Sequence, residues 1–167
     1  MNTSPADRSP SDIQRRLVTT GLILGMGQAG FYDGIVLHQL LQWHHMFSGI
    51  KTDATVVGLE LNTLGDGLFH LFDWFLLSLG ITLMWQLVQL RVPLSTRTLL
   101  AAGVLGFGLF NLVEGLIDHQ LLGIHHVKSG PHELAYDIGF LILNAIITAI
   151  GWRLLRTSQK QTASSPQ

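Results

Sequence analysis

Asp33-Gly-Ile-Val-Leu-His-Gln-Leu-Leu-Gln-Trp-His-His-Met46 occurs a second time in this 167-residue chain, in a diverged form. The second copy is Glu114-Gly-Leu-Ile-Asp-His-Gln-Leu-Leu-Gly-Ile-His-His-Val127, at an offset of 114 − 33 = 81 residues. Seven of the fourteen positions are identical, and an acid opens both copies. Such a repeat predicts a protein with two equivalent halves, each carrying one acid and three histidines in the same order.

The composition favours a membrane protein with a single domain. Hydrophobic residues make up 47% of the chain and charged residues 13%, and the mean hydropathy is +0.37. A net charge of −1 offers no basic surface for nucleic acid. The chain has no cysteine, which excludes disulfides, thiolate metal sites and haem attached through cysteine.

Helical periodicity and turn signals predict four helices in a domain over residues 15–156, between disordered tails at 1–14 and 157–167. The first two helices form one repeat, at about 15–91, and the last two form the other, at about 97–156. Helices are expected at about 15–45, from a cap at 63–66 to about 90, at about 98–124 and at about 132–155. Ser11 is expected to begin a capping box, and residues 48–61 a loop. The expected fold is an all-α transmembrane four-helix bundle of two parallel two-helix repeats.

The charge distribution predicts four membrane spans with both termini in the cytoplasm. Eight basic residues fall in the tails and the middle turn, against only Lys51 and Lys128 in the other two loops. These eight are Arg8, Arg15, Arg16, Arg91, Arg97, Arg153, Arg156 and Lys160. A cleaved signal peptide is one competing interpretation, because basic residues precede the first apolar run. A soluble all-α domain is another, because an acid interrupts every apolar run.

Counting residues from these cytoplasmic charges predicts that the ionisable side chains lie in two layers, both in the extracytoplasmic half of the membrane-spanning bundle. One acid on each helix lies 16 to 18 residues from a basic residue, or about 24–27 Å along a helix. These acids are Asp33, Asp73, Glu114 and Asp137. About one turn further out are His38, His70 and His119, with Asp118, His132 and Glu133 at similar depth.

Helical spacing also predicts which of these residues share a face. Asp66, His70 and Asp73 form one stripe, and His45 and His126 lie seven residues after His38 and His119. In contrast, Asp33 and His38 are five residues apart, which is about 140° around an α-helix. These two side chains therefore need not bind the same ion.

A helical bundle that gathers acids and histidines predicts a metal site for Zn²⁺, Fe²⁺ or Mn²⁺. The expected ligands are His38, His70 and His119. Ligands or supporting partners come from Asp33, Asp73, Glu114, Asp137, Asp66, Asp118, Glu133, His132, His45 and His126. Asp118 has no acidic counterpart in the first copy and is the first place to look for a functional difference between the halves.

Several alternatives to a metal-centred enzyme or accessory factor stay open. The acids and histidines can pair without a cofactor, His38 and His119 can serve as axial haem ligands, and the parallel repeat also suits a metal or proton carrier. The His pairs 44/45 and 125/126 equally suit solvated caps or the membrane interface. The substrate and the oligomeric state do not follow from these residues.

The motifs Phe31–His45, Gly65–Asp73 and Asn111–His126 resemble a bacterial family of small membrane proteins catalogued as domain of unknown function 2243. The resemblance covers roughly residues 16–156. It implies a bacterial inner-membrane protein with four spans, surrounded by the lipid bilayer, and it carries no known activity.

Overall fold

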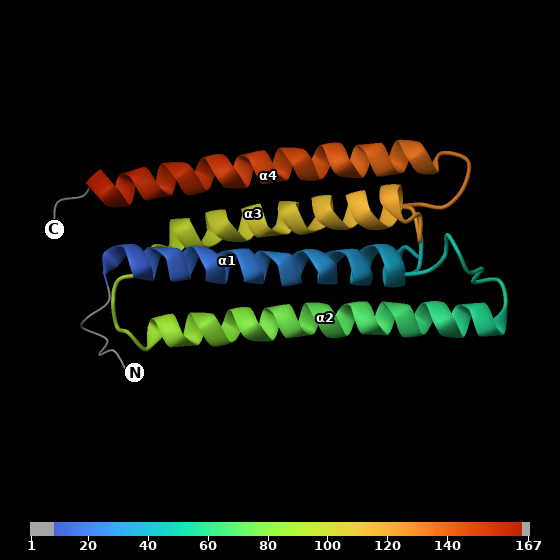
Figure 1. Ribbon diagram of the computed structural model, residues 1–167, viewed down its shortest axis with the longest axis horizontal. Coiled ribbons are helices and arrows are strands. Elements are labelled where there is room, and N and C mark those ends of the chain that lie inside the picture. The colour runs from blue at the N-terminus through green and yellow to red at the C-terminus, as the bar shows by residue number, and fades with distance from the viewer. Residues whose placement is uncertain (1–8, 165–167) are drawn as a thin grey trace.

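The computed structural model describes residues 9–164, and every regular element in that range is a helix (Figure 1). The predicted all-α fold is therefore confirmed, while residues 1–8 and 165–167 of the expected tails lie outside the described residues. The elements are α1 (Pro10–Tyr32), α2 (Val56–Val88), α3 (Thr96–Glu114) and α4 (Glu133–Ser164). A π-helix continues α1 as η2 (Asp33–Leu40), and another continues α3 as η3 (Gly115–Leu121).

Two predicted helix starts were wrong because earlier caps were available. The hydroxyl of Ser9 accepts a hydrogen bond from the backbone N–H of Asp12 (3.2 Å), so α1 begins with Pro10 at its first position. The hydroxyl of Thr55 accepts one from the N–H of Gly58 (3.1 Å), so α2 begins within the predicted loop 48–61.

The predicted helix ends also differ. The long first and third helices were expected to include the His-His pairs, but η2 and η3 end before them. At the other end of the protein, α4 continues to Ser164, whereas a disordered tail was expected from residue 157.

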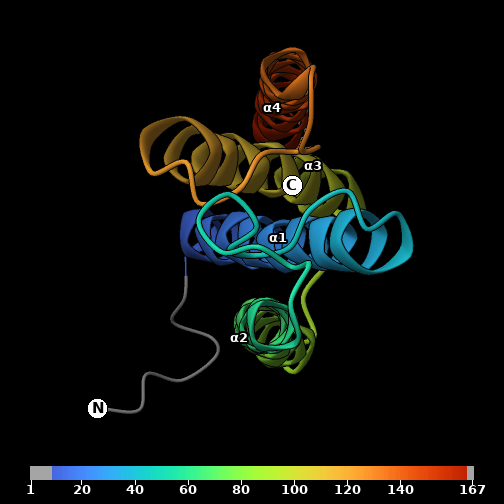
Figure 2. The same ribbon diagram turned by 90° about the vertical axis from the view of Figure 1, so that its right-hand side faces the viewer.

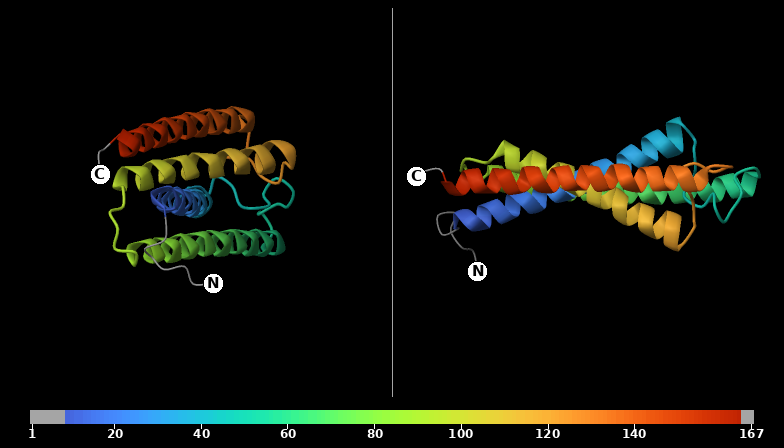
Figure 3. Two further views of the ribbon diagram at one scale, coloured as in Figure 1. Left: turned by 60° about the vertical axis from the view of Figure 1, so that its left-hand side comes forward. Right: turned by 90° about the horizontal axis from the view of Figure 1, so that it is seen from above.

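The four helices form a stack rather than a square bundle. The order is α2, α1, α3, α4 (Figures 1 and 2). Helix α2 meets α3 through the rings of Phe69 and Phe110, whose centroids are 6.2 Å apart. From above, α1 and α3 cross as an X between the two outer helices (Figure 3). The first residues of α1 and the last residues of α4 lie at the same end of the helix stack (Figure 1). An even number of membrane spans, as predicted, requires this arrangement.

Glycines allow α1 and α3 to cross in close contact. A Cβ atom at Gly25 would overlap the backbone of Gly103, and one at Gly106 would overlap the backbone of Leu22. The two contacts are equivalent under the 81-residue repeat. Small residues thus form the contact surfaces of the two central helices.

Three helical segments are long and apolar enough to cross a membrane: Val56–Val88, Thr96–Leu121 and Glu133–Gln161. Their large exposed side chains, such as Leu68, Phe75 and Ile142, provide the apolar surface that lipid requires. Helix α1 does not meet the same criterion. It lies between α2 and α3, and five of its seven buried positions hold glycine or alanine.

Candidate metal centre

The π-helix η2 brings together two side chains that an α-helix would separate. Nε2 of His38 lies 3.0 Å from Oδ2 of Asp33, although the residues are five positions apart. In a π-helix the backbone bonds run from i to i+5, as in the bond from the N–H of Leu41 to the carbonyl of Val36 (2.9 Å). The expectation that these side chains lie on different faces was therefore wrong.

The second half repeats this arrangement. Nε2 of His119 lies 3.0 Å from Oε1 of Glu114, and the N–H of Leu122 donates to the carbonyl of Ile117 (2.8 Å). π-Helical turns are often found at functional sites. Here both occur in the repeated motif, and both place an acid beside a histidine.

A left-handed residue after each π-helix turns the chain back over the helix end. Gln42 (φ 50°) follows η2, and the equivalent Gly123 (φ 58°) follows η3. Glycine adopts this conformation without strain, whereas glutamine rarely does. The turn carries His44 and His125 into the centre, so both are buried (2% and 1% exposed) instead of solvated at a helix end.

The two outer loops hold these histidines by exchanging hydrogen bonds across the two halves. Nδ1 of His44 donates to the carbonyl oxygen of Val127 (2.8 Å), and Nδ1 of His125 donates to that of Met46 (3.0 Å). A neutral imidazole that donates from Nδ1 has its free lone pair on Nε2. The loops therefore aim two Nε2 atoms inward.

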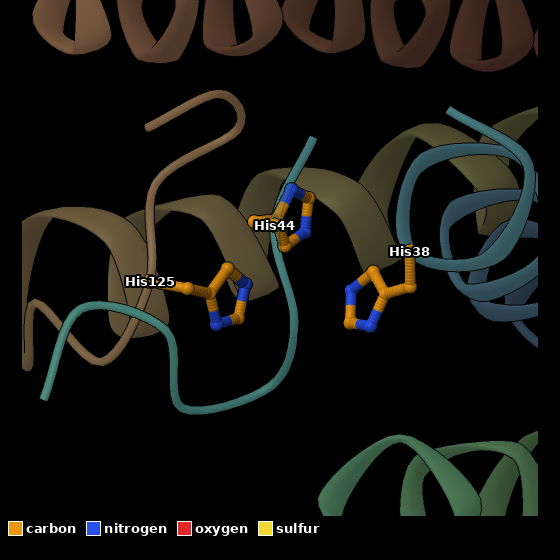
Figure 4. A group of neighbouring side chains, drawn as sticks. All are labelled: His38, His44 and His125. Carbon is orange, nitrogen blue, oxygen red and sulfur yellow. The ribbon is translucent and has the colours of Figure 1, made fainter. Parts of the chain in front are cut away.

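Four imidazole rings pack together at the centre. The ring centroids of His38 and His44 are 4.3 Å apart, those of His44 and His125 4.6 Å, and those of His119 and His125 4.8 Å. Figure 4 shows three of these rings facing one another, with His38 on a helix and His44 and His125 on loops. Ligand atoms lie within 4.8 Å of one another in two buried groups, His38/His44/His125 and Glu114/His119/His125.

Several short contacts at the centre lack hydrogen-bond alignment. Nε2 of His38 and Oδ2 of Asp33 are 3.0 Å apart, yet neither has a hydrogen-bond partner among the described residues. Nε2 of His44 and of His119 are likewise buried and unpartnered. Buried atoms that lie close together without being aligned for a hydrogen bond have the arrangement of ligands around a common ion.

A bound cation and protonated histidines are two ways of satisfying these contacts. His125 has hydrogen-bond acceptors at both ring nitrogens. His38 has one at Nδ1, and the misaligned Oδ2 of Asp33 lies 3.0 Å from its Nε2. Without a cation, these contacts would favour an imidazolium form of both rings. The ring centroids of His38 and His125 are 5.8 Å apart, and two unit charges at that distance repel by about 3 kcal/mol at an effective dielectric constant of 20. Burial is the main cause that lowers the pKa of His44 to about 2, so this ring stays neutral as a metal ligand must.

Two buried acids support the centre from behind. Asp66 accepts hydrogen bonds from Nδ1 of His38 (2.8 Å), Nδ1 of His45 (2.7 Å) and the N–H of Met46 (2.8 Å). Its carboxylate thereby fixes one histidine of the centre and the start of the outer loop. Asp66 and His45 are thus placed as supporting partners rather than as ligands.

Asp137 is the equivalent acid in the second half, at an offset of 137 − 66 = 71 residues. It accepts from Nδ1 of His126 (2.7 Å) and the N–H of Val127 (2.9 Å), and lies 3.6 Å from Nδ1 of His119. The depth count had grouped Asp137 with Asp73. In the structure the counterpart of Asp73 is Asn144, seven residues or about two turns after Asp137.

The remaining predicted residues lie around or outside the centre. His70 and Asp73 face α1 beside it, against Gly34 and Gly30. Asp118 is half-buried and belongs to neither group of ligand atoms. His132 is exposed, and Glu133 is half-exposed, with Oε1 3.9 Å from Nε2 of His126.

Sequence patterns pointed to His44 and His125 only weakly. The repeat marked both positions, and Gly123 after the third helix is a helix-end signal that could have placed His125 in a loop. Nothing local marks Gln42 as the same turn, because glutamine has no preference for positive φ.

Comparison with known proteins places the chain in one family. The family model described as "Predicted membrane protein (DUF2243)" matches residues 20–158, so the chain belongs to this family of predicted membrane proteins. The match includes both copies of the repeat, and with them Asp33, His38, His44, Glu114, His119 and His125. No curated protein and no solved structure matches the chain.

Proposed function

We propose that this member of the predicted membrane-protein family is a metalloprotein with a two-ion centre. Each half would hold one ion with two histidines and one carboxylate. The first set is Asp33, His38 and His44, and the second is Glu114, His119 and His125. The observation that carries the proposal is the convergence of these six buried side chains. Nε2 of His38, His44 and His119 has no aligned partner among the described residues, while Nδ1 of His38, His44 and His125 is hydrogen-bonded.

The donor set favours Zn²⁺, Fe²⁺ or Mn²⁺. Two histidines with one carboxylate are typical of non-haem iron sites and of catalytic zinc sites, and the chain has no thiolate. Three protein ligands leave coordination positions open for water or substrate, which favours a metalloenzyme over an accessory factor. When bound, the ions would supply Lewis-acid or redox chemistry.

The chain itself would orient these ligands and limit access to them. Asp66 accepts a hydrogen bond from His38, and Asp137 lies 3.6 Å from Nδ1 of His119. Backbone carbonyls hold His44 and His125. A polar pocket of about 540 Å³ between the outer loops has His44 in its wall. A small polar solute is the kind of substrate that this pocket admits.

The charge pattern supports a location in the outer half of a bacterial inner membrane. In this proposal α1 crosses the bilayer with the other three helices, both termini are cytoplasmic, and the loops bearing Lys51 and Lys128 face outward. The polar pocket then opens on the extracytoplasmic side.

The geometry disfavours the two alternative functions. A haem between His38 and His119 would need the space that His44 and His125 fill, because neighbouring rings in this cluster are 4.3 to 4.8 Å apart. A carrier would need a path to the cytoplasm. The close crossing of α1 and α3 at Gly25 and Gly106 leaves no room for one between these helices.

Metal analysis of protein purified in mild detergent tests the proposal. We expect two ions per chain, one ion in His44→Ala and in His125→Ala, and two in the control His132→Ala, which removes an exposed histidine. An absorption spectrum without a Soret band is expected. Metal-free protein that does not rebind Zn²⁺, Fe²⁺ or Mn²⁺ would leave structural Asp–His pairing as the explanation.

A further inference from the structure

A second pocket, on the side of the helix stack, is lined by residues of η2, α3, α4 and the outer loops. Its volume is about 500 Å³, within the usual range of small-molecule sites. Tyr32 and Leu143 in its wall are 52% and 56% exposed, so the pocket opens toward the lipid around the helices. Phe140 lies between the pocket and the proposed metal centre, with its ring centroid 5.6 Å from that of His119.

Aromatic rings are concentrated in the wall of this pocket, although the repeat does not require them. Five of its fourteen lining residues are aromatic, namely Tyr32, Trp43, Phe107, Tyr136 and Phe140. At the offsets of 81 and 71 residues, the first four of these correspond to Val113, Ile124, Met26 and Gly65. The equivalent positions thus pack in the same fold without these rings. Their presence in this pocket favours a ligand that itself contains an aromatic ring.

Gly139 on α4 leaves space in the wall of the pocket. A Cβ atom added there would have no atom within 4 Å. The equivalent residue on α2 is Leu68, at 139 − 71 = 68. The first half therefore carries a leucine side chain where the second half has an open position.

The same wall contains a buried hydrogen-bond acceptor without a donor. Nδ2 of Asn144 donates to the carbonyl oxygen of Phe140 (2.9 Å), and Oδ1 of Asn144 accepts from Nδ2 of Asn111 (2.9 Å). These two bonds fix the orientation of the Asn111 amide. Its Oδ1 has no hydrogen-bond partner among the described residues, although Asn111 is only 2% exposed. A buried acceptor left unpaired costs free energy, which an O–H group of a ligand would recover.

We propose that this pocket binds a lipid-soluble aromatic alcohol, of the phenol or hydroquinone class, whose ring hydroxyl donates a hydrogen bond to Oδ1 of Asn111. The aromatic wall suits the ring, and the opening toward the bilayer suits an apolar tail. A phospholipid acyl chain would fill the same space but would leave the acceptor unpaired. The inference goes beyond the proposed function and does not depend on bound metal, because none of the six proposed metal ligands lines this pocket.

A pair of probes that differ only in the hydroxyl group tests the hydrogen bond. They are para-octylphenol and its methyl ether, para-octylanisole, which keeps the ring and the tail but cannot donate. Binding to the purified full-length protein is measured by equilibrium dialysis with the same detergent on both sides of the membrane. The double variant Asn111→Leu/Asn144→Leu replaces both amides with apolar groups, so that neither partner is left unpaired.

A second pair of variants tests the location. Gly139→Phe places a ring in the pocket at a position with open space, so the helix packing need not change. Gly67→Phe is the matched control, because Gly67 is also an exposed helical glycine whose added Cβ would meet no atom within 4 Å.

We expect one para-octylphenol per chain in the wild type and in Gly67→Phe, with para-octylanisole bound about tenfold more weakly. Gly139→Phe should weaken phenol binding by at least the same factor, and the double variant should bind both probes equally. Equal binding of the two probes by the wild type would overturn the proposal and indicate an acyl-chain site. Absence of phenol binding by the wild type, or full binding by Gly139→Phe, would also overturn it. Protein that binds the phenol but no metal would contradict the proposed function alone.

Discussion

His44 and His125 stack face to face, with ring centroids 4.6 Å apart and ring planes 5° apart, and each donates to a carbonyl in the loop of the other half. The loop histidine of each half is thus held by the opposite half. Neither half can build its proposed metal set alone, which gives a physical reason for keeping both copies of the motif in one chain.

The supporting acids are expected to control metal affinity. Asp66→Asn and Asp137→Asn remove the charge behind His38 and His119, and each should weaken metal binding 10- to 100-fold. Competition with a chelator measures this effect. Asp53→Asn changes an exposed acid in an outer loop and should leave the affinity within a factor of two.

Metal removal is expected to destabilise the protein. A ligand present at 100 times its dissociation constant stabilises the folded state by about 2.7 kcal/mol, so excess chelator should lower the melting temperature. The double variant His44→Ala/His125→Ala lacks two of the six ligands and should show no shift with chelator. An equal shift in the two proteins would argue against metal binding at this centre.

The glycines at the crossing are expected to be intolerant of a single methyl group. Gly25→Ala and Gly106→Ala force α1 and α3 apart and should cost about 1–3 kcal/mol of stability. The same substitution at Gly67 or Gly139, where an added Cβ has nothing within 4 Å, should be neutral or stabilise by about 0.5–1 kcal/mol. Thermal unfolding in detergent compares the four variants.

The absence of cysteine makes the membrane orientation directly testable. In intact cells, a membrane-impermeant maleimide should label Ala54→Cys in an outer loop and should not label Pro93→Cys in the middle turn. Both positions are exposed, so labelling of both is expected once the membrane is permeabilised. The reverse pattern would place the metal centre on the cytoplasmic side.

The sequence alone determined the parts of this protein that depend on local pattern and on repetition. The 81-residue repeat, the four helices, the small-residue faces and the clustering of acids and histidines at one end all follow from residue spacing. Each is a property of a single helix or of two copies of one segment. These features therefore do not depend on how the helices pack against one another.

Only the tertiary structure decided which side chains meet. Spacing predicts a helix face only if the backbone bonds run from i to i+4, and the π-helices η2 and η3 break that condition, bringing Asp33 to His38 and Glu114 to His119. The positions of His44 and His125 depend on positive φ angles and on hydrogen bonds to residues 83 and 79 positions away. Such contacts have no local signature, because the partners come together only when the two halves pack.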